Sequence, residues 1–194
     1  MRNLLPIATG RQVLPLHLAL IRQPWLWNTR TSRTGPAGSV HAETDDIWLR
    51  ANPIIGSPEP HNSEWMAAYY NLPEVRPLIF DLMRMVEGVQ LGGVLITRVP
   101  PGCSVKPHVD LAWHAQYYDK YIIQVAGNPK QAFVFEEGSH STNPGDVFWF
   151  NNQQIHSVTN DSHEDRISLI VCIRHDRRIV ETPTAVGGFD AAKP

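Results

Sequence analysis

The chain is poor in cysteine and lacks long apolar runs. Only Cys103 and Cys172 are present, and Cys172 lies in the apolar run Leu169 to Ile173, where a reduced thiol packs as a small hydrophobic group. No run approaches the roughly 18 apolar residues of a membrane helix. Pro6 and the polar residues 9–12 interrupt the continuous apolar stretch that a signal peptide needs. We therefore expect a cytoplasmic protein that is neither a disulfide scaffold nor a membrane protein.

The chain also has few charged residues of either sign. The 17 basic and 19 acidic residues leave a net charge of -2, which gives no general attraction to nucleic acid or membranes. The first 40 residues nevertheless hold Arg2, Arg11, Arg22, Arg30 and Arg33 and no acidic residue. These arginines form either a basic binding arm or a set of scattered, solvated side chains, and the second interpretation is preferred. Neither interpretation indicates an oligomeric state.

What the chain does contain is enough apolar sequence for one domain. Its 194 residues are 42% hydrophobic and 19% charged, and we expect a single domain over 1–194. Residues 1–90 would supply strands, loops and a supporting helix, residues 91–176 the core, and residues 177–194 a C-terminal tail.

Alternating leucines between Val13 and Ile21 predict a strand, which Pro15 would place at a sheet edge, and Trp25 and Trp27 continue the period of two. Residues 29–39 lack apolar side chains and predict an exposed loop. A short strand is expected at Ile47 to Leu49, followed by a Pro-rich loop over residues 52–63.

Helical spacing is clear once, over residues 78–86, with Pro77 in the first turn and Gly88 at the end. The remaining chain predicts short strands separated by turn residues, at 94–99, 121–125, 132–135, 146–150, 156–159 and 167–174. Many short strands imply an all-β core with a few flanking helices. The fold class expected is a double-stranded β-helix, that is, a cupin-like jelly roll.

His108 and Asp110 open the segment with chemical interest. In extended backbone, residues i and i+2 face the same side, so this pair can share one metal ion, and imidazole with carboxylate suits Fe(II). The pattern alone is weak, because His163 and Asp165 repeat it in a run of polar residues that predicts a solvated turn. His156, at the start of a later strand, is the third candidate ligand.

Arg166 lies ten residues after His156. If residues 156–159 and 167–174 pair as a hairpin around Asp161, His156 and Arg166 stand opposite each other. A dicarboxylate co-substrate could then chelate the metal with one end and meet the guanidinium with the other. The alternative for Arg166 is a surface ion pair with the acidic residues of the turn, Asp161, Glu164 or Asp165.

Three stretches resemble the aspartyl/asparaginyl β-hydroxylase group of Fe(II)/2-oxoglutarate-dependent oxygenases. They are TRVPPGCSVKPHVD (97–110), PGDVFWFNN (144–152) and IHSVTN with DRISLIV after it (155–171). The resemblance implies that His108, Asp110 and His156 bind Fe(II) and that Arg166 holds the distal carboxylate of 2-oxoglutarate. Some members have glycine in place of the aspartate, whereas this chain keeps the full triad.

The resemblance also implies that Thr97 assists the distal carboxylate and that Lys120 assists the proximal one. The reaction implied uses O2, decarboxylates 2-oxoglutarate to succinate and hydroxylates an unactivated carbon. The substrate would be amino-acid-like, either a free amino acid or an Asp, Asn or Pro side chain in a peptide. Aromatic and histidine residues directly after the metal motif are candidates for the substrate-facing wall: Trp113, His114, Tyr117 and Tyr118.

Two other classes remain open. His156 and Asn160 resemble the second cupin motif, which favours a cupin-type metalloenzyme that does not use 2-oxoglutarate; Arg166 would then lack a role. The third possibility is a non-catalytic metal-binding or ligand-binding module, whose basic N-terminal arm meets an acidic partner.

Overall fold

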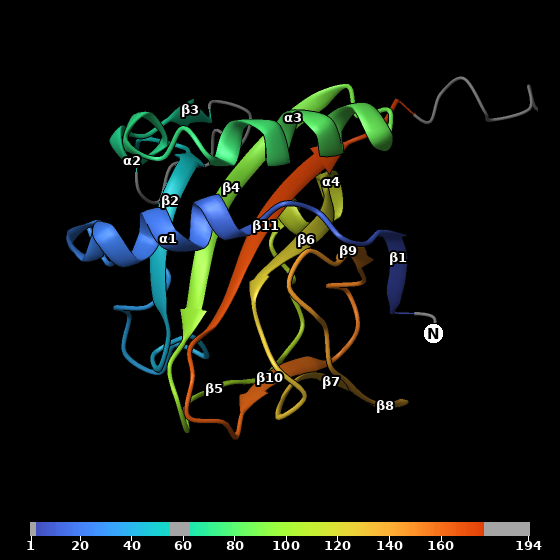
Figure 1. Cartoon of the computed structure of the whole chain (residues 1–194). Coiled ribbons are helices and arrows are strands. Elements are labelled where there is room, and N and C mark those ends of the chain that lie inside the picture. The colour runs from blue at the N-terminus through green and yellow to red at the C-terminus, as the bar shows by residue number, and fades with distance from the viewer. Residues whose placement is uncertain (1–2, 55–62, 177–194) are drawn as a thin grey trace, which may run out of the picture.

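The computed structural model describes residues 3–54 and 63–176 (Figure 1). The expected tail over 177–194 and most of the expected loop over 52–63 lie outside these ranges. Within them the elements follow in the order β1 (Leu4–Ala8), α1 (Leu14–Arg22), the 3-10 helix η1 (Pro24–Leu26), β2 (Asp45–Ala51), β3 (Glu64–Trp65), α2 (Ala67–Asn71), α3 (Val75–Met85), β4 (Gln90–Val99), β5 (Ser104–His108), α4 (Trp113–Tyr117), β6 (Asp119–Ala126), β7 (Gln131–Phe135), β8 (Gly138–His140), β9 (Val147–Phe150), β10 (His156–Asn160) and β11 (Arg166–Arg174).

The described strands form two antiparallel sheets. The larger has the order β1-β9-β6-β11-β4-β2-β3, and the smaller has the order β5-β10-β7-β8. Helices α1 and α3 lie across one face of the larger sheet, and the smaller sheet lies apart from them (Figure 1). Apolar side chains from both sheets, including Ile122, Phe133 and Val158, pack together between them. This arrangement confirms the expected double-stranded β-helix with a few flanking helices.

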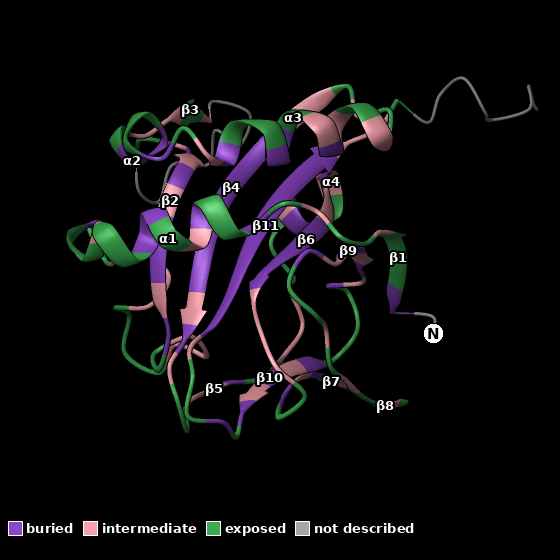
Figure 2. Cartoon of the chain, in the orientation of Figure 1, coloured by how far each residue is buried: buried purple, intermediate pink, exposed green. Residues whose placement is uncertain are grey.

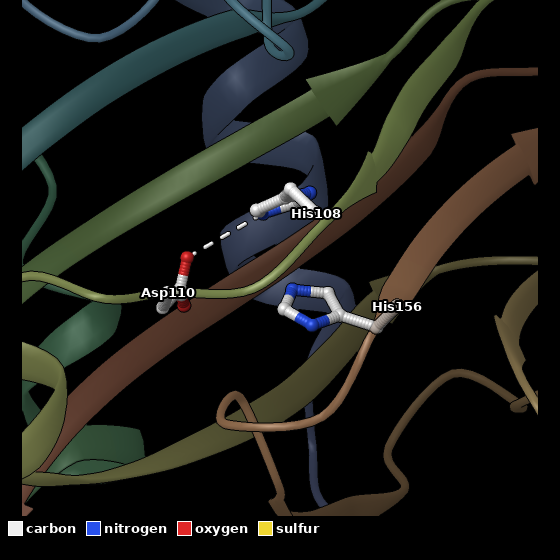
Figure 3. A group of neighbouring side chains, drawn as sticks. All are labelled: His108, Asp110 and His156. Carbon is white, nitrogen blue, oxygen red and sulfur yellow. Dashed lines mark ion pairs between the residues drawn. The ribbon is translucent and has the colours of Figure 1, made fainter.

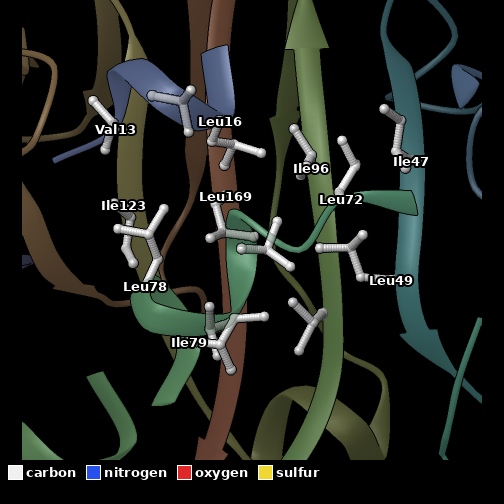
Figure 4. Close-up of a cluster of buried hydrophobic side chains, with 14 of the residues drawn as sticks. Val13, Leu16, Ile47, Leu49, Leu72, Leu78, Ile79, Ile96, Ile123 and Leu169 are labelled. Carbon is white, nitrogen blue, oxygen red and sulfur yellow. The ribbon is translucent and has the colours of Figure 1, made fainter. Parts of the chain in front are cut away.

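Strand β11 shows why the central strands are buried on both faces (Figure 2). Its odd-numbered residues from Ile167 to Ile173 join the cluster beneath the helices, where they meet Leu16 of α1 and Ile79 of α3 (Figure 4). Its even-numbered residues face the interior between the sheets, because successive side chains of a strand point to opposite faces. Arg166 therefore belongs to the inner face.

The expected strand over residues 13–21 is wrong, because α1 occupies this segment. Its buried residues are Leu16, Ala19 and Leu20, the spacing of a helical face, while Leu18 is exposed. Leucines at every second position include the pair Leu16 and Leu20, which are also four residues apart as on a helical face. The leucine spacing alone therefore could not distinguish a strand from a helix. Pro15 lies in the first helical turn, where its missing N–H has no partner to lose. The strand pattern predicted to continue at Trp25 and Trp27 is also wrong, because the 3-10 helix η1 spans residues 24–26.

The expected hairpin between residues 156–159 and 167–174 is also wrong. Strand β10 pairs with β5 and β7 in the smaller sheet, whereas β11 pairs with β4 and β6 in the larger one. Residues 161–165 therefore connect two sheets. Short spacing suggested a hairpin, but the chain crosses from the smaller sheet to the larger one between β10 and β11.

The other expected elements are present. The helix predicted over 78–86 is α3, the strand predicted at 47–49 is β2, and the six strands predicted between 94 and 174 are β4, β6, β7, β9, β10 and β11. The expected exposed loop over residues 29–39 is irregular, but Arg30 and Arg33 within it are only partly exposed. Sequence reasoning missed β1, whose Pro6 is tolerated because β1 is an edge strand. None of the helices in the described residues has the length and apolar character needed to cross a membrane.

Candidate metal centre

Three candidate ligands come together at the end of the smaller sheet (Figure 3). His108 ends β5 and His156 begins β10, and the two residues are register partners in the antiparallel pair. Asp110 follows two residues after His108, where its backbone N–H donates to the Asn152 carbonyl at 3.0 Å. One potential ligand atom from each of the three residues lies within 4.8 Å of the others. The strand pairing, which sequence could not supply, brings His156 to the other two.

Both histidines are held in the orientation that a metal requires. Nδ1 of His108 lies 2.8 Å from the Lys106 carbonyl, and Nδ1 of His156 lies 2.8 Å from the Gln154 carbonyl. Because a carbonyl oxygen only accepts, each Nδ1 carries the hydrogen and each Nε2 keeps its lone pair. Burial, opposed by the bond to the Gln154 carbonyl, lowers the pKa of His156 to about 4, so its ring is neutral near pH 7.

Asp110 is charged and already held. Burial favours the neutral acid, but the contact with the His108 ring together with the positive charge and hydrogen bond of Lys120 outweighs it, and the pKa of Asp110 falls far below its usual range. Nζ of Lys120 donates to Oδ2 of Asp110, while Oδ1 lies 3.4 Å from Nε2 of His108. One carboxylate oxygen thus faces the histidines and the other faces the lysine. Two imidazoles with one carboxylate fit a divalent ion such as Fe(II).

Arg166 is buried, with an exposed fraction of 2%, which rules out the surface ion pair with Asp161, Glu164 or Asp165. Its guanidinium donates to Oγ of Ser168 at 2.8 Å and to Oε1 of Gln124 at 2.9 Å, and it lies 4.0 Å from the centre of the Phe133 ring. Among the described residues, no carboxylate lies within ion-pair distance of it. A buried cation without an anion is strongly unfavourable, and a negatively charged ligand beside it would relieve that cost.

Arg33 was missed by the sequence analysis, although it lies beside the candidate co-substrate residues. It donates to both carboxylate oxygens of the fully buried Asp46, at 2.9 and 2.6 Å, and to Oγ1 of Thr97 at 3.0 Å. Asp46 and Thr97 are register partners on β2 and β4. The interpretation of the N-terminal arginines as solvated side chains is therefore wrong for Arg33. The loop that contains Arg33 has no periodic apolar pattern from which burial could be predicted. The position of Arg33 follows only from its ion pair with Asp46, which is buried on β2.

Two residues of the triad, His108 and Asp110, line a cavity of about 810 Å³, and a smaller space of about 40 Å³, lined by His108 and His156, adjoins it. The two share Arg33, His41, His108, Lys120 and Ile170. Thr97, Ser168 and Arg166 line only the smaller space, which also contacts His156. Burial and the nearby Arg33 keep His41 neutral by lowering its pKa to about 2. The candidate metal therefore lies between an inner polar end and a wide outer chamber.

The aromatic segment after the metal motif divides between two cavities. Trp113, His114 and Tyr118 line the large cavity together with His108 and Asp110. Tyr117 instead lines a separate cavity of about 500 Å³, where the Arg174 guanidinium lies 3.9 Å from the centre of its ring. These residues belong to the short helix α4, on which the rings of Trp113 and Tyr117 lie 5.8 Å apart although they line different cavities.

The fold and the ligand set define the class: a double-stranded β-helix that gathers two histidines and one carboxylate at the mouth of its barrel, as non-haem Fe(II) oxygenases do. Residues 60–176 match the sequence profile of the family described as aspartyl/asparaginyl beta-hydroxylase. Because this match spans more than half of the chain, the protein belongs to that family, and the family and fold support the class of 2-oxoglutarate-Fe(II) oxygenases.

Solved structures agree at the level of the fold. A prolyl hydroxylase from Trichoplax adhaerens, solved with a hypoxia inducible factor oxygen degradation domain peptide fragment, has a TM-score of 0.56 at 10% identity, covering 88% of this chain and 81% of its own. A 2OG-Fe(II) oxygenase family oxidoreductase from Burkholderia pseudomallei has a TM-score of 0.52 at 14% identity, covering 68% and 67%. A comparison with curated proteins gave no significant match.

Proposed function

We propose that the protein is an Fe(II)/2-oxoglutarate-dependent dioxygenase that hydroxylates an unactivated carbon of an amino-acid-like substrate. The observation that carries the proposal is Arg166, a buried guanidinium without a carboxylate among the described residues, in a space that also contacts two of the triad residues, His108 and His156. A metal-binding protein without a dicarboxylate co-substrate has no use for such an unfavourable group. This argument favours the oxygenase over a cupin that does not use 2-oxoglutarate.

In this proposal, His108, Asp110 and His156 hold Fe(II) through two Nε2 atoms and one carboxylate oxygen. The hydrogen bonds to Lys106 and Gln154 fix both imidazole rings, and Lys120 holds the second oxygen of Asp110. The metal, with 2-oxoglutarate and O2, supplies the oxidation and the decarboxylation to succinate. The protein contributes ligand orientation and a shielded cavity.

Arg166 and Thr97 would bind the distal carboxylate of 2-oxoglutarate. The Thr97 hydroxyl accepts a hydrogen bond from Arg33, so its own hydrogen is left to donate to a ligand in the same small space. Lys120, which lines both cavities beside Asp110, lies where it can assist the proximal carboxylate at the metal. A dicarboxylate is thus oriented by cations at both ends.

The substrate would enter the large cavity, whose wall includes Trp113, His114 and Tyr118. The family description supports an aspartyl or asparaginyl side chain, and the peptide bound to the Trichoplax adhaerens prolyl hydroxylase raises proline in a peptide as a second candidate. A cavity of about 810 Å³ also accommodates a free amino acid.

An anaerobic titration tests the proposal. Fe(II)-loaded protein is titrated with 2-oxoglutarate while the visible spectrum is recorded, and glutarate, which lacks the keto group and cannot chelate, serves as the control. We expect a weak charge-transfer band with 2-oxoglutarate only. Iron binding without a band would contradict the proposal and favour the cupin alternative.

A further inference from the structure

A second arginine without a carboxylate lines the large cavity. The charged side chains on its wall are Arg30, Arg33, Lys120 and Asp110. Arg33 is paired with Asp46, and Lys120 is paired with Asp110. For Arg30, no carboxylate of residues 3–54 or 63–176 lies within ion-pair distance. Its Nε donates to Oγ of Ser32 at 3.3 Å. The outer chamber therefore contains one cation that no carboxylate of the described residues neutralises.

Arg30 is held in place by an aromatic surface. Its guanidinium carbon lies 5.6 Å from the centre of the Trp48 ring, within the range of a cation–π contact. Trp48 is on β2 beside β4, and its main-chain register partner is Leu95, another residue of the cavity wall. A planar guanidinium stacked on a fixed ring keeps its N–H edges free for a ligand and loses little freedom when one binds.

Polar atoms without partners gather around the same cavity. Six buried side-chain polar atoms of the described residues have no hydrogen-bond partner, and four of them belong to residues that line this cavity: His41, Trp48, Ser63 and Tyr118. Buried polar atoms are normally satisfied, so a cluster of unsatisfied ones indicates the place of a polar ligand. The indole N–H of Trp48 can only donate, as the Arg30 guanidinium can, so an acceptor group suits both.

We propose that Arg30, which lies over Trp48, binds the main-chain carboxylate of a free amino acid at a subsite separate from the Arg166 end. An internal Asp of a peptide also carries a carboxylate, and the comparison of each free acid with its amide tests against that occupant. This inference rests on the proposed function and adds the recognition group that selects the substrate. The two unpaired arginines match two anions, the co-substrate in the inner space and the substrate in the outer chamber. The hydroxyls of Ser63 and Tyr118 can accept from an ammonium group on the same molecule.

The test uses Fe(II)-loaded, 2-oxoglutarate-saturated full-length protein and the twenty common L-amino acids, each paired with its carboxamide. Stimulated succinate formation is measured for wild type and for Arg30→Gln, with Arg22→Gln on the exposed surface of α1 as the matched control. We expect at least one free acid to stimulate turnover better than its amide. Arg30→Gln should raise the half-saturating concentration of the acid about 10-fold to 100-fold and leave that of the amide unchanged.

Loss of discrimination between acid and amide is the readout that a purely structural role of Arg30 would not produce. Arg30→Lys, which keeps the charge, should restore part of it, and the half-saturating concentration of 2-oxoglutarate should not change. If no free acid outperforms its amide, or if Arg30→Gln binds both as wild type does, the inference is overturned. The charge-transfer band distinguishes failure of the Arg30 inference from failure of the proposed function. If the band forms but Arg30 has no effect on substrate choice, only the Arg30 inference is wrong. If the band does not form, the oxygenase assignment is wrong as well.

Discussion

Replacing Arg166 by alanine should remove most of the affinity for 2-oxoglutarate while sparing the fold. The side chain donates to Ser168 and to Gln124, but Oε1 of Gln124 also accepts from Thr142 at 2.8 Å and from Ser168 at 3.3 Å. After the truncation Gln124 Oε1 keeps two donors and the Ser168 hydroxyl keeps its hydrogen bond to Gln124, so neither side chain is left without a partner. It also removes a buried cation that lacks an anion, which offsets part of the lost packing against Phe133.

The effect on binding can be estimated from the burial of the pair. Losing one partner of a buried, hydrogen-bonded charge pair costs about 2–5 kcal/mol, and the lower limit corresponds to about 30-fold weaker binding. At a 2-oxoglutarate concentration about 100 times the wild-type Kd, binding stabilises wild type by about 2.7 kcal/mol and such a variant by about 0.9 kcal/mol. For a chain of this size the rise in Tm should be about 5–10 °C for wild type and about 2–3 °C for the variant.

Thermal unfolding of the anaerobic Fe(II) protein, with and without 2-oxoglutarate, measures this difference. Arg174→Ala is the matched control, because Arg174 lies on the same strand, stacks on Tyr117 and lines neither cavity at the triad. It should keep the full rise in Tm. An equal rise for wild type and Arg166→Ala would refute the assignment of Arg166 to the co-substrate, and with it the reasoning from an unpaired buried charge.

Three further outcomes are expected. Asp110→Ala should abolish substrate-stimulated succinate formation and weaken iron binding, measured by equilibrium dialysis, while the circular dichroism spectrum is retained; full turnover would remove the triad from consideration. Leu16→Ala should lower the free energy of unfolding by about 2–5 kcal/mol, whereas Leu18→Ala on the exposed face of α1 should change it by less than about 0.5 kcal/mol, and equal losses in denaturant titrations would contradict the helix. Burial raises the pKa of Cys172 from 9.0 to about 11, so the folded protein keeps this proton while the unfolded chain releases it, and stability should decline as the pH rises from 9.0 to about 11. At pH 8, mass spectrometry after iodoacetamide treatment should find Cys103 modified and Cys172 intact, and rapid modification of Cys172 would show that the thiol is accessible.

Local pattern was sufficient where one physical cause dominates. Short strands with turn residues between them predicted β4, β6 and β11, and the spacing of buried residues predicted α3. It failed for residues 13–21, because leucines at every second position satisfy both periods until the partner surface is known. Only packing under α1 selects Leu16 and Leu20 for burial and leaves Leu18 in solvent.

The candidate site also has a part that the sequence predicts and a part that depends on tertiary contacts. His108 and Asp110 are two residues apart, so their proximity was predictable from extended backbone, and the position of His156 at the start of a strand suggested the third ligand. The reason given for placing Arg166 near His156 was nevertheless wrong, because the two residues lie on different sheets. They meet across the space between the sheets. Arg30 and Arg33 lie in an irregular loop, whose path over the cavity depends on tertiary contacts such as the pair between Arg33 and Asp46.

The inner face of the larger sheet explains the direction in which ligands would bind. On β11 the inward residues are polar at one end, Arg166 and Ser168, and less polar at the other, Ile170 and Cys172. Because a buried cation is unfavourable without an anion, this gradient favours a negatively charged ligand at the Arg166 end. A dicarboxylate placed there has one orientation, with its distal carboxylate inward and its other end at the triad. The large cavity on the outer side of the triad is then left to the substrate, and Arg30 on its wall becomes the group that decides which substrates stay.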